Sequence, residues 1–282
     1  MQFYKIKSYA KINISLRVLT KFKSKLHKIE SLVSFLNFYD EIYIKKIYSN
    51  NHKIIFKGKF SHKIPKNNTI SNLLKILDDK KKLRDQKYLI KIKKKIPQKS
   101  GMGGGSMNAA SVFKYLIKDQ NMKLSSKQIF QITSKIGSDV ILGMQNKTPI
   151  IFNNGNLKFL NKKITLFTLL VRPNFGCSTK KIYKGVKFYS RPIFKKNKKI
   201  NINYNFLSIL NNDLEKSAFK KYPVLKKIKI FMEKLDDILF VNMTGSGSTI
   251  VGYFNSKKNA LKAQKILKKK YKNYWCILSK TI

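Results

Sequence analysis

The sequence contains few arginines and few acidic side chains. Lys and Arg number 61 against 13 Asp and Glu, a formal net charge of +48, and the arginines are only Arg17, Arg84, Arg172 and Arg191. Surfaces that read nucleic acid usually recruit arginine, whose planar guanidinium forms bidentate hydrogen bonds. Lysine is instead spread along the chain with many Ile and Asn, the residues that AT-rich codons favour, so we interpret the charge as mutational bias on a solvated surface. Binding of nucleic acid or anionic membrane through counterion release stays open as the functional alternative.

Cysteine and long apolar runs are also scarce. The two cysteines, Cys177 and Cys276, lie far apart and match no metal-binding or redox spacing, which predicts reduced thiols in a cytoplasmic protein. No apolar run approaches the roughly 20 residues of a membrane-spanning helix, and the longest, Ile164–Val171, predicts a buried strand. The first residues lack the apolar block of a signal peptide. We therefore expect a cytoplasmic protein without a membrane partner.

Apolar residues are present in the amount that a folded protein needs, at 43% of 282 residues. This length suits one large domain or two ordinary ones. Alternating apolar residues predict a strand at Ile12–Val18, helical spacing predicts a helix at Thr69–Leu77, and Ser125 with Gln128 predicts a capping box. The pattern favours an α+β fold with a boundary near residue 160, giving domains 1–160 and 161–282. Further strands are expected at Ser31–Phe38, Glu41–Tyr48, His52–Phe56, Tyr88–Ile96, Lys163–Arg172, Ile238–Met243, Thr249–Phe254 and Tyr274–Leu278, and further helices at Ser106–Ile117, Phe206–Phe219, Val224–Leu235 and Ala260–Leu267.

The strongest motif is a glycine-rich segment between a predicted strand and a predicted helix. Glycine lets the backbone approach a ligand closely and adopt positive φ, so that successive N–H groups point outward. The helix N-terminus adds partial positive charge, which suits a polyphosphate such as that of ATP. Ser106 would cap the helix or offer its hydroxyl to a phosphate or a bound Mg²⁺. The segment reads Pro97, Gln98, Lys99, Ser100, Gly101, Met102, Gly103, Gly104, Gly105, Ser106, Met107.

The same residues exclude two common nucleotide-binding loops. No Gly-Lys-Ser/Thr ends the segment, as a Walker A loop requires. Its glycines are contiguous, whereas a Rossmann fingerprint spaces them as GxGxxG. A flexible glycine turn without a ligand is the structural alternative. Four glycines within Gly101–Gly105, next to a helix, make that alternative the weaker one.

The glycine-rich segment resembles the signature phosphate loop of the GHMP kinases. Three further segments match that family in the same order along the chain. Ala10–Ile14 resembles its N-terminal Ala-Lys-Ile-Asn strand, Ile136–Val140 its Gly-Ala/Ser-Asp-Val segment, and Thr244–Ser248 its C-terminal glycine turn. Each match alone is weak, but four in order span most of the chain. Lys99 and Met107 depart from the family, which often has Gly and Ser there.

This resemblance implies a fold, cofactors and a catalytic pair. The fold would be the two-domain GHMP kinase fold, α+β, with an N-terminal domain like ribosomal protein S5 domain 2 and a ferredoxin-like C-terminal domain. ATP and Mg²⁺ would be the cofactors, with no metal site made by the protein alone. Asp139 would be the catalytic base and Lys11 its cationic neighbour. Without the family match, Asp139 is a carboxylate at a helix end and Lys11 is one surface lysine among many.

Within the superfamily, the resemblance points to the kinases of diphosphocytidyl-methylerythritol. The Ala-Lys-Ile-Asn opening is followed about 16 residues later by His27. The implied reaction phosphorylates the 2-hydroxyl of the methylerythritol unit in the non-mevalonate route to isoprenoids. The family stacks an aromatic on cytosine where this chain has Leu26, so Tyr183 or Phe188 is the expected substitute. The implied substrate-binding residues are Asn13, His27, Tyr183, Gly245, Ser246 and Gly247.

Two alternatives accompany this interpretation. Another GHMP enzyme, such as homoserine or mevalonate kinase, would share the phosphate loop but not the base pocket. A basic nucleic-acid-binding protein on an S5-like fold would use the glycine segment only structurally. We expect small-molecule substrates as partners, with no specific nucleic acid and no membrane, and the sequence leaves monomer and homodimer open.

Overall fold

The computed structural model describes residues 2–21, 27–145, 147–161, 164–194 and 202–282. These form two compact units that interleave along the chain. Because the units do not follow a single cut, they do not test the predicted boundary near residue 160, which stays a prediction. Strands β1 (Tyr4–Lys21) and β2 (His27–Ile47) pair with each other and supply residues to both units. The first unit comprises Met1–Ala10, Phe38–Gln98 and Gly103–Asn146, and the second comprises Lys11–Asn37, Lys99–Met102 and Lys147–Ile282.

The sheet of the first unit is built on β4 (Lys87–Lys93), which lies between β2 and β3 (Lys53–Lys57). β4 runs antiparallel to β2 and parallel to β3. The two strands predicted at Ser31–Phe38 and Glu41–Tyr48 are one continuous strand, β2, of 21 residues. The polar residues near Asp40 do not interrupt it, because the Asp40 side chain is fully buried and paired.

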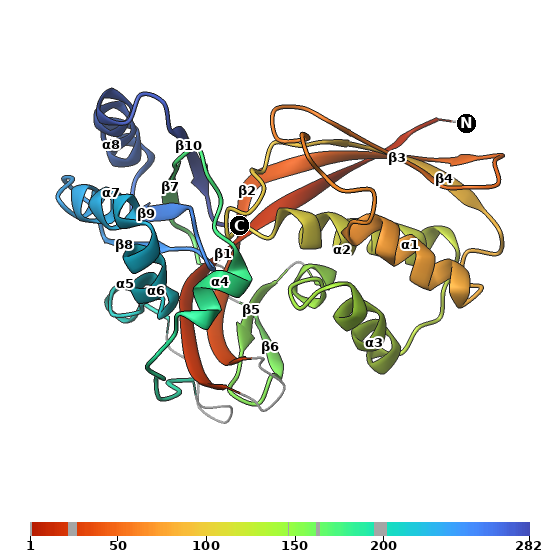
Figure 1. The fold of residues 1–282 in the computed structure, drawn as a ribbon, viewed down its shortest axis with the longest axis horizontal. Coiled ribbons are helices and arrows are strands. Elements are labelled where there is room, and N and C mark those ends of the chain that lie inside the picture. The colour runs from red at the N-terminus through yellow and green to blue at the C-terminus, as the bar shows by residue number, and fades with distance from the viewer. Residues whose placement is uncertain (1, 22–26, 146, 162–163, 195–201) are drawn as a thin grey trace. The chain divides into compact units, whose positions relative to one another are not determined.

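Three α-helices and a short 3₁₀ helix complete the first unit. Both predicted helix starts carry capping boxes, from Asn68 before α1 and from Ser125 before α3. Such caps satisfy backbone N–H groups that have no partner inside the helix. Figure 1 labels these helices and the strands of this unit. Apolar residues of the helices pack on those of β2 and β4 in one core that includes Ile44, Leu73 and Phe113. The helices are α1 (Thr69–Asp79), α2 (Gly104–Asp119), α3 (Ser126–Ile136) and η1 (Ile141–Met144).

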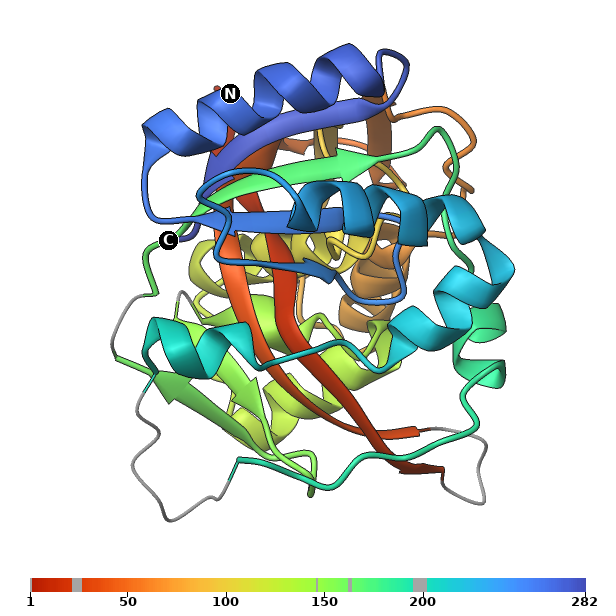
Figure 2. The ribbon, with the colours of Figure 1, turned by 90° about the vertical axis from the view of Figure 1, so that its left-hand side faces the viewer.

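The second unit contains a four-stranded antiparallel sheet in the order β10-β7-β9-β8. Helices α7 (Pro223–Glu233) and α8 (Lys257–Lys270) cover one face of this sheet (Figure 2). The βαββαβ sequence of elements and this strand order are those of a ferredoxin-like domain, as predicted for this half of the chain. The strands are β7 (Phe167–Arg172), β8 (Phe240–Met243), β9 (Ile250–Phe254) and β10 (Trp275–Lys280).

The second unit also contains shorter elements. A hairpin of β5 (Thr148–Ile151) and β6 (Leu157–Leu160) pairs with β2 through β5. Helix α4 (Thr179–Lys184) follows β7, and α5 (Tyr204–Ser208) and α6 (Leu214–Lys221) precede α7. Among the residues that the structure describes, no helix combines the length and apolar character that crossing a membrane requires.

The single helix predicted at Phe206–Phe219 is wrong, because the chain forms α5 and α6 with a break between them. Strand β1 takes the backbone groups at the break. Leu16 N–H donates to the Asn211 carbonyl at 3.0 Å, and Asp213 N–H donates to the Leu16 carbonyl at 2.8 Å. These long-range bonds replace the helical ones that the apolar spacing predicted.

Candidate functional site

The second half of the predicted phosphate loop lies in the first unit and begins α2. Gly103 is the N-cap residue, in the left-handed conformation at φ 65°, and the helix starts at Gly104. Ser106 is therefore the third residue of the helix and not its cap, which leaves its hydroxyl for the second predicted role. The first turn contains no acidic side chain, so the partial positive charge of the helix end is not offset locally.

A buried ion pair lies at the base of this helix start. The carboxylate of Asp40, fully buried, pairs with Lys94, which is 4% exposed. It also accepts hydrogen bonds from the N–H groups of Lys95 at 2.7 Å and Ile96 at 2.8 Å, and from Asn108 Nδ2 at 3.0 Å. One side chain thus joins β2, the segment before the loop and helix α2. A Cβ atom on Gly104 would lie 3.0 Å from Ile96 and 3.2 Å from Lys94 Nζ, so any side chain there would press on these two residues.

The predicted base, Asp139, lies in the turn between α3 and η1, close to the first turns of α2. A Cβ atom on Gly137 would lie 3.8 Å from Ser106 Oγ, and one on Gly143 would lie 2.7 Å from Ala110 Cβ. The turn and η1 therefore pack directly on α2. Asp139 is half-buried, and its carbonyl accepts the Leu142 N–H at 3.2 Å to begin η1. The first unit brings the predicted base and Ser106 into one region.

The predicted cation, Lys11, lies in the second unit within a chain of polar contacts. The residue is 4% exposed, and its ammonium donates to Asn13 Oδ1 at 2.7 Å. Asn13 Nδ2 in turn donates to Ser31 Oγ at 2.8 Å. The backbone N–H of Lys11 donates to the Met102 carbonyl at 3.1 Å. Both predicted residues of the N-terminal strand are thus oriented by buried neighbours.

Three predicted segments contact one another in the second unit: the N-terminal strand, the first part of the phosphate loop and the C-terminal glycine turn. Thr244 Oγ1 accepts the Asn13 N–H at 2.9 Å and donates to the Gly101 carbonyl at 3.3 Å. A Cβ atom on Gly101 would lie 2.0 Å from the Thr244 carbonyl, and one on Gly245 would lie 3.0 Å from the Gly101 carbonyl. Both glycines have positive φ, 78° and 54°. The contact at Gly101 leaves no room for a side chain. A side chain at Gly245 would strain its left-handed backbone and require the Gly101 carbonyl to shift.

The predicted base-binding pair also forms in the second unit. The rings of His27 and Tyr183 lie 5.0 Å apart with an interplanar angle of 39°. Phe188, the other expected aromatic, is 75% exposed and lies under Lys216, whose Nζ is 5.7 Å from the ring centroid. The contact with His27 therefore favours Tyr183. Leu26 lies outside the described residues.

Ser246 links this pair to the glycine turn. Its hydroxyl lies 2.9 Å from Thr179 Oγ1, on the same helix, α4, that carries Tyr183. Gly247 completes the turn at φ 81°. Helix α4 therefore contacts the turn at one end and His27 at the other.

The remaining loop residues hold the loop in place. Gln98 Nε2 donates to the carbonyls of Phe60 at 2.9 Å and His62 at 2.7 Å. The Lys99 carbonyl accepts the Cys177 N–H at 3.1 Å, and the Ser100 carbonyl accepts the Thr249 N–H at 3.3 Å. Pro97 and Met102 are buried, and Met107 packs close to the Gly143 position.

The two thiols are held in their protonated form. Both cysteines are free, and burial raises the pKa of Cys177 and of Cys276 to about 11. Each thiol is therefore protonated near neutral pH, and the thiolate is the nucleophilic form. In the described part of the chain, no three His, Cys, Asp or Glu side chains lie close enough to hold a metal ion.

Sequence reasoning missed the residues that support both glycine segments. Asp40, Lys94 and Asn108 support the phosphate loop, and Asn212 and Glu215 support the glycine turn. Asp40 and Glu215 belong to a small set of 13 acidic residues, which was the available signal. Their partners are distant in sequence, so no local pattern identified them.

Comparisons with known proteins give a consistent family. The model of the GHMP kinases N terminal domain matches residues 68–154, and that of GHMP kinases C terminal matches residues 196–273. A 4-diphosphocytidyl-2-C-methyl-D-erythritol kinase of Pelagibacter ubique is 51% identical over 282 residues, which is 100% of both chains. A protein of the same name from Thermoanaerobacter pseudethanolicus is 31% identical over 295 residues, covering 100% of this chain and 97% of its own.

Solved structures add the likeness of fold. The crystal structure of a 4-(cytidine 5'-diphospho)-2C-methyl-D-erythritol kinase superposes with a TM-score of 0.78 at 20% identity, over 99% of each chain. A homoserine kinase from Cytophaga hutchinsonii gives 0.69 at 16% identity, over 100% of this chain and 95% of its own. At these identities the structures establish the two-domain GHMP kinase fold and nothing finer.

Proposed function

This chain belongs to the GHMP kinases, in the family of 4-diphosphocytidyl-2-C-methyl-D-erythritol kinases, and on that premise we propose that it phosphorylates the 2-hydroxyl of 4-diphosphocytidyl-2-C-methyl-D-erythritol. It is a small-molecule kinase with ATP as phosphoryl donor. The substrate assignment rests on the 51% identity with a 4-diphosphocytidyl-2-C-methyl-D-erythritol kinase over the full length of both chains. Homoserine kinase resembles the chain only in fold, at 16% identity.

The start of α2 provides the proposed site for the ATP phosphates. The backbone N–H groups from Gly103 to Ser106 lie at the start of the helix, where the helix dipole favours anions. Mg²⁺ fits this site, because it keeps several waters and is held by phosphates with few protein ligands. The Ser106 hydroxyl is the side chain that we assign to the ion or to a phosphate. When bound, the ion would neutralise charge on the transferring phosphoryl group.

The second unit provides the proposed site for the cytidyl substrate. The cytosine ring would stack on Tyr183, beside His27, and stacking on one aromatic contributes about 1–3 kcal/mol. The turn Gly245, Ser246 and Gly247, with its serine hydroxyl beside Thr179, would hold polar groups of the substrate. Asn13 has one amide hydrogen on Ser31 and a second that we assign to the substrate, since an amide nitrogen carries two.

Asp139 and Lys11 are the proposed catalytic pair. The substrate hydroxyl oxygen would form a bond to the γ-phosphorus while the bond from that phosphorus to the β–γ bridging oxygen breaks and ADP leaves. The hydroxyl proton would pass to the Asp139 carboxylate. Lys11 would offset negative charge at the reacting oxygen, and its orientation by Asn13 supports this role. The two residues belong to different compact units, so their meeting at the substrate is part of the proposal.

A substrate panel tests the proposed function. Purified protein with ATP and Mg²⁺ should phosphorylate the cytidyl substrate and leave homoserine and mevalonate unmodified, as measured by product mass and ADP release. Product formation from homoserine or mevalonate at a comparable kcat/KM would contradict the substrate assignment.

Nucleic acid should bind weakly and be released at about 0.2 M salt, because such binding rests on counterion release alone.

A further inference from the structure

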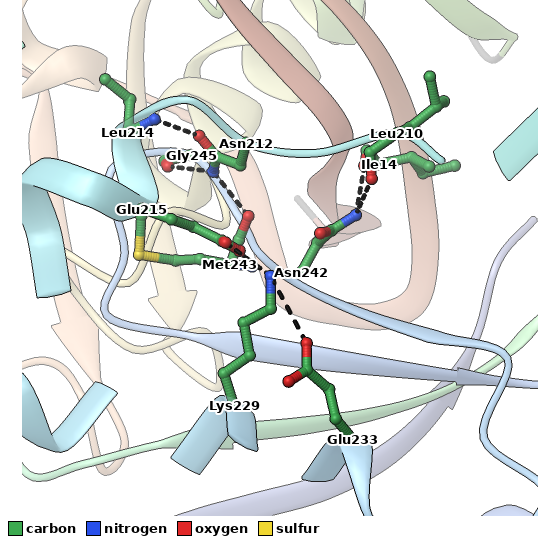
Figure 3. A network of polar contacts seen from close by, with 10 residues as sticks. All are labelled: Ile14, Leu210, Asn212, Leu214, Glu215, Lys229, Glu233, Asn242, Met243 and Gly245. Atoms are coloured by element: carbon green, nitrogen blue, oxygen red, sulfur yellow. Dashed lines mark hydrogen bonds and ion pairs between the residues drawn. The ribbon is translucent and has the colours of Figure 1, made fainter. Parts of the chain in front are cut away.

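Asn212 lies between α5 and α6 and reaches the glycine turn from one side (Figure 3). Its side chain is 3% exposed. Nδ2 donates to the carbonyl of Met243 at 2.6 Å and to that of Gly245 at 2.8 Å, and Oδ1 accepts the Leu214 N–H at 3.0 Å. Both amide hydrogens are therefore used on the turn, and the oxygen begins α6.

Met243 is held on both of its backbone groups by side chains. Glu215 accepts the Met243 N–H at 2.7 Å, while Asn212 takes the Met243 carbonyl. Met243 ends β8, which is the last strand in the order of its sheet. Asn212 and Glu215 thus supply the bonds that a neighbouring strand would otherwise make. Lys229 Nζ donates to the Glu215 carboxylate at 2.6 Å, and this contact holds the Glu215 side chain in place (Figure 3).

The turn that follows Met243 has no freedom to shift without disturbing other proposed site residues. Thr244 bonds Asn13 and Gly101, and a Cβ atom on Gly245 would lie only 3.0 Å from the Gly101 carbonyl. Gly245 lies in the left-handed region at φ 54°, which glycine adopts without strain, so this conformation alone does not hold the turn in place. The two bonds from Asn212, on either side of Thr244, fix the direction of the turn.

We propose that Asn212 is a positioning residue for the alcohol substrate, acting through the carbonyls of Met243 and Gly245. This inference rests on the proposed substrate role of the turn. An amide is the required group, because both of its hydrogens point at carbonyl oxygens. A carboxylate of the same shape would place an acceptor against two acceptors and push the turn away.

The test compares Asn212→Asp with Asn242→Asp. Asn242 is an internal control of the same type: it is also 3% exposed and its Nδ2 also donates to two carbonyls, those of Ile14 at 3.1 Å and Leu210 at 2.9 Å. Neither of its partners belongs to the glycine turn (Figure 3). Both variants lose two equivalent buried bonds, so their melting temperatures should fall by similar amounts.

The kinetic constants should separate the two variants. Asn212→Asp should lower kcat/KM for the cytidyl substrate by about 10- to 100-fold, because misplacing a binding group by about 1 Å can cost that much. KM for ATP should change less, because the turn reaches the phosphate loop only through Gly101. Asn242→Asp should keep kcat/KM within a few-fold of the parent, measured well below its melting temperature. If Asn212→Asp does not fold, Asn212→Ser keeps one donor and should give a smaller loss in the same constant.

A third variant separates this inference from the function beneath it. Gly245→Ala changes the turn directly and should lower kcat/KM for the cytidyl substrate if the turn binds it. Normal kinetics in Gly245→Ala would remove the turn from the substrate site. Impaired Gly245→Ala together with normal Asn212→Asp, or equal kinetic losses in Asn212→Asp and Asn242→Asp at matched stability, would overturn the positioning role of Asn212 alone.

Discussion

The two glycine-rich segments are supported by different chemistry. The start of α2 rests on a buried ion pair, Asp40 with Lys94, which has further bonds to backbone N–H groups and to Asn108. The turn at Gly245 rests on a neutral amide, Asn212, beside the acid Glu215. Charge beneath a helix start couples electrostatically to an anion bound there, whereas the bonds of Asn212 fix a direction. The ion pair of Glu215 with Lys229 reaches only the N–H of Met243, the residue before the turn.

Removal of the charged support, the ion pair of Asp40 with Lys94, should have the largest effect on stability. Asp40→Ala leaves Lys94 as a buried cation without its carboxylate, which costs about 3–5 kcal/mol in the free energy of unfolding. ATP affinity should fall as well, because α2 loses its bond through Asn108. Urea denaturation and ATP titration measure these two losses.

A double variant shows whether the charges or the packing matter. Asp40→Leu with Lys94→Met removes the ion pair together, and such replacements are often near neutral in stability. It should recover only the part of the unfolding free energy that the unpaired Lys94 costs, because the N–H groups of Lys95 and Ile96 and the amide of Asn108 still lose their acceptor. A loss below about 1 kcal/mol in Asp40→Ala, the value of an exposed pair, would contradict the importance of the pair.

The next effect separates chemistry from support. Asp139 lies beside α2 but outside the ion pair, so Asp139→Asn should preserve folding and ATP binding. Its single-turnover rate should fall by about 100-fold or more, because a general base is lost. Lys11→Ala should also lose turnover, and the double variant should be little worse than either single one, since residues that act as a unit are not additive. A rate within a few-fold of the parent would exclude Asp139 as the base.

A smaller effect is expected from Tyr183, which lies in the second unit and is the proposed stacking partner of the substrate. Tyr183→Ala should raise KM for the cytidyl substrate about tenfold, in keeping with the loss of one stacked aromatic, and leave KM for ATP unchanged. Phe188→Ala is the matched control, because Phe188 is exposed and the ring contact with His27 is made by Tyr183. A larger KM increase in Phe188→Ala than in Tyr183→Ala would reverse the assignment.

The smallest expected effect is the pH dependence of stability through His52, which is outside both glycine segments. Burial lowers the pKa of His52 from 6.5, even though Asp78 opposes the shift. His52 Nδ1 accepts the Tyr88 N–H at 3.1 Å and therefore must be unprotonated. The unfolded chain takes up the proton first, so stability should fall as the pH drops below about 6.5 and through the folded pKa. His52→Gln should show less of this slope in the unfolding free energy, and an unchanged slope would assign it to other groups.

The sequence predicted the segments of the site better than their supports. Motif order assigned Gly101 to ATP and Asn13 and Gly245 to the substrate, and these roles stay predictions. The structure adds that the three residues lie close together in the second unit. Local signals also placed the capping box at Ser125. These features depend on neighbours in the chain or on a family pattern.

The supports could not be predicted, because each joins residues far apart in the chain. Asp40 and Lys94 are separated by 54 residues, and Asn212 and Gly245 by 33. Periodicity places a residue on a face but does not say which side chain opposes it. The role of Gly104 is a related case: its missing side chain makes room for Ile96 and Lys94. A valine there would disturb the packing beneath the loop whether or not phosphate binds.

The occupied edge of β8 has a consequence for how molecules of this protein meet. An edge strand with open N–H and C=O groups is a template for pairing with another chain, and proteins commonly block such edges. At Met243 both groups are already engaged by Glu215 and Asn212. A strand from a second molecule would have to displace two buried side chains before it could extend the sheet at that residue.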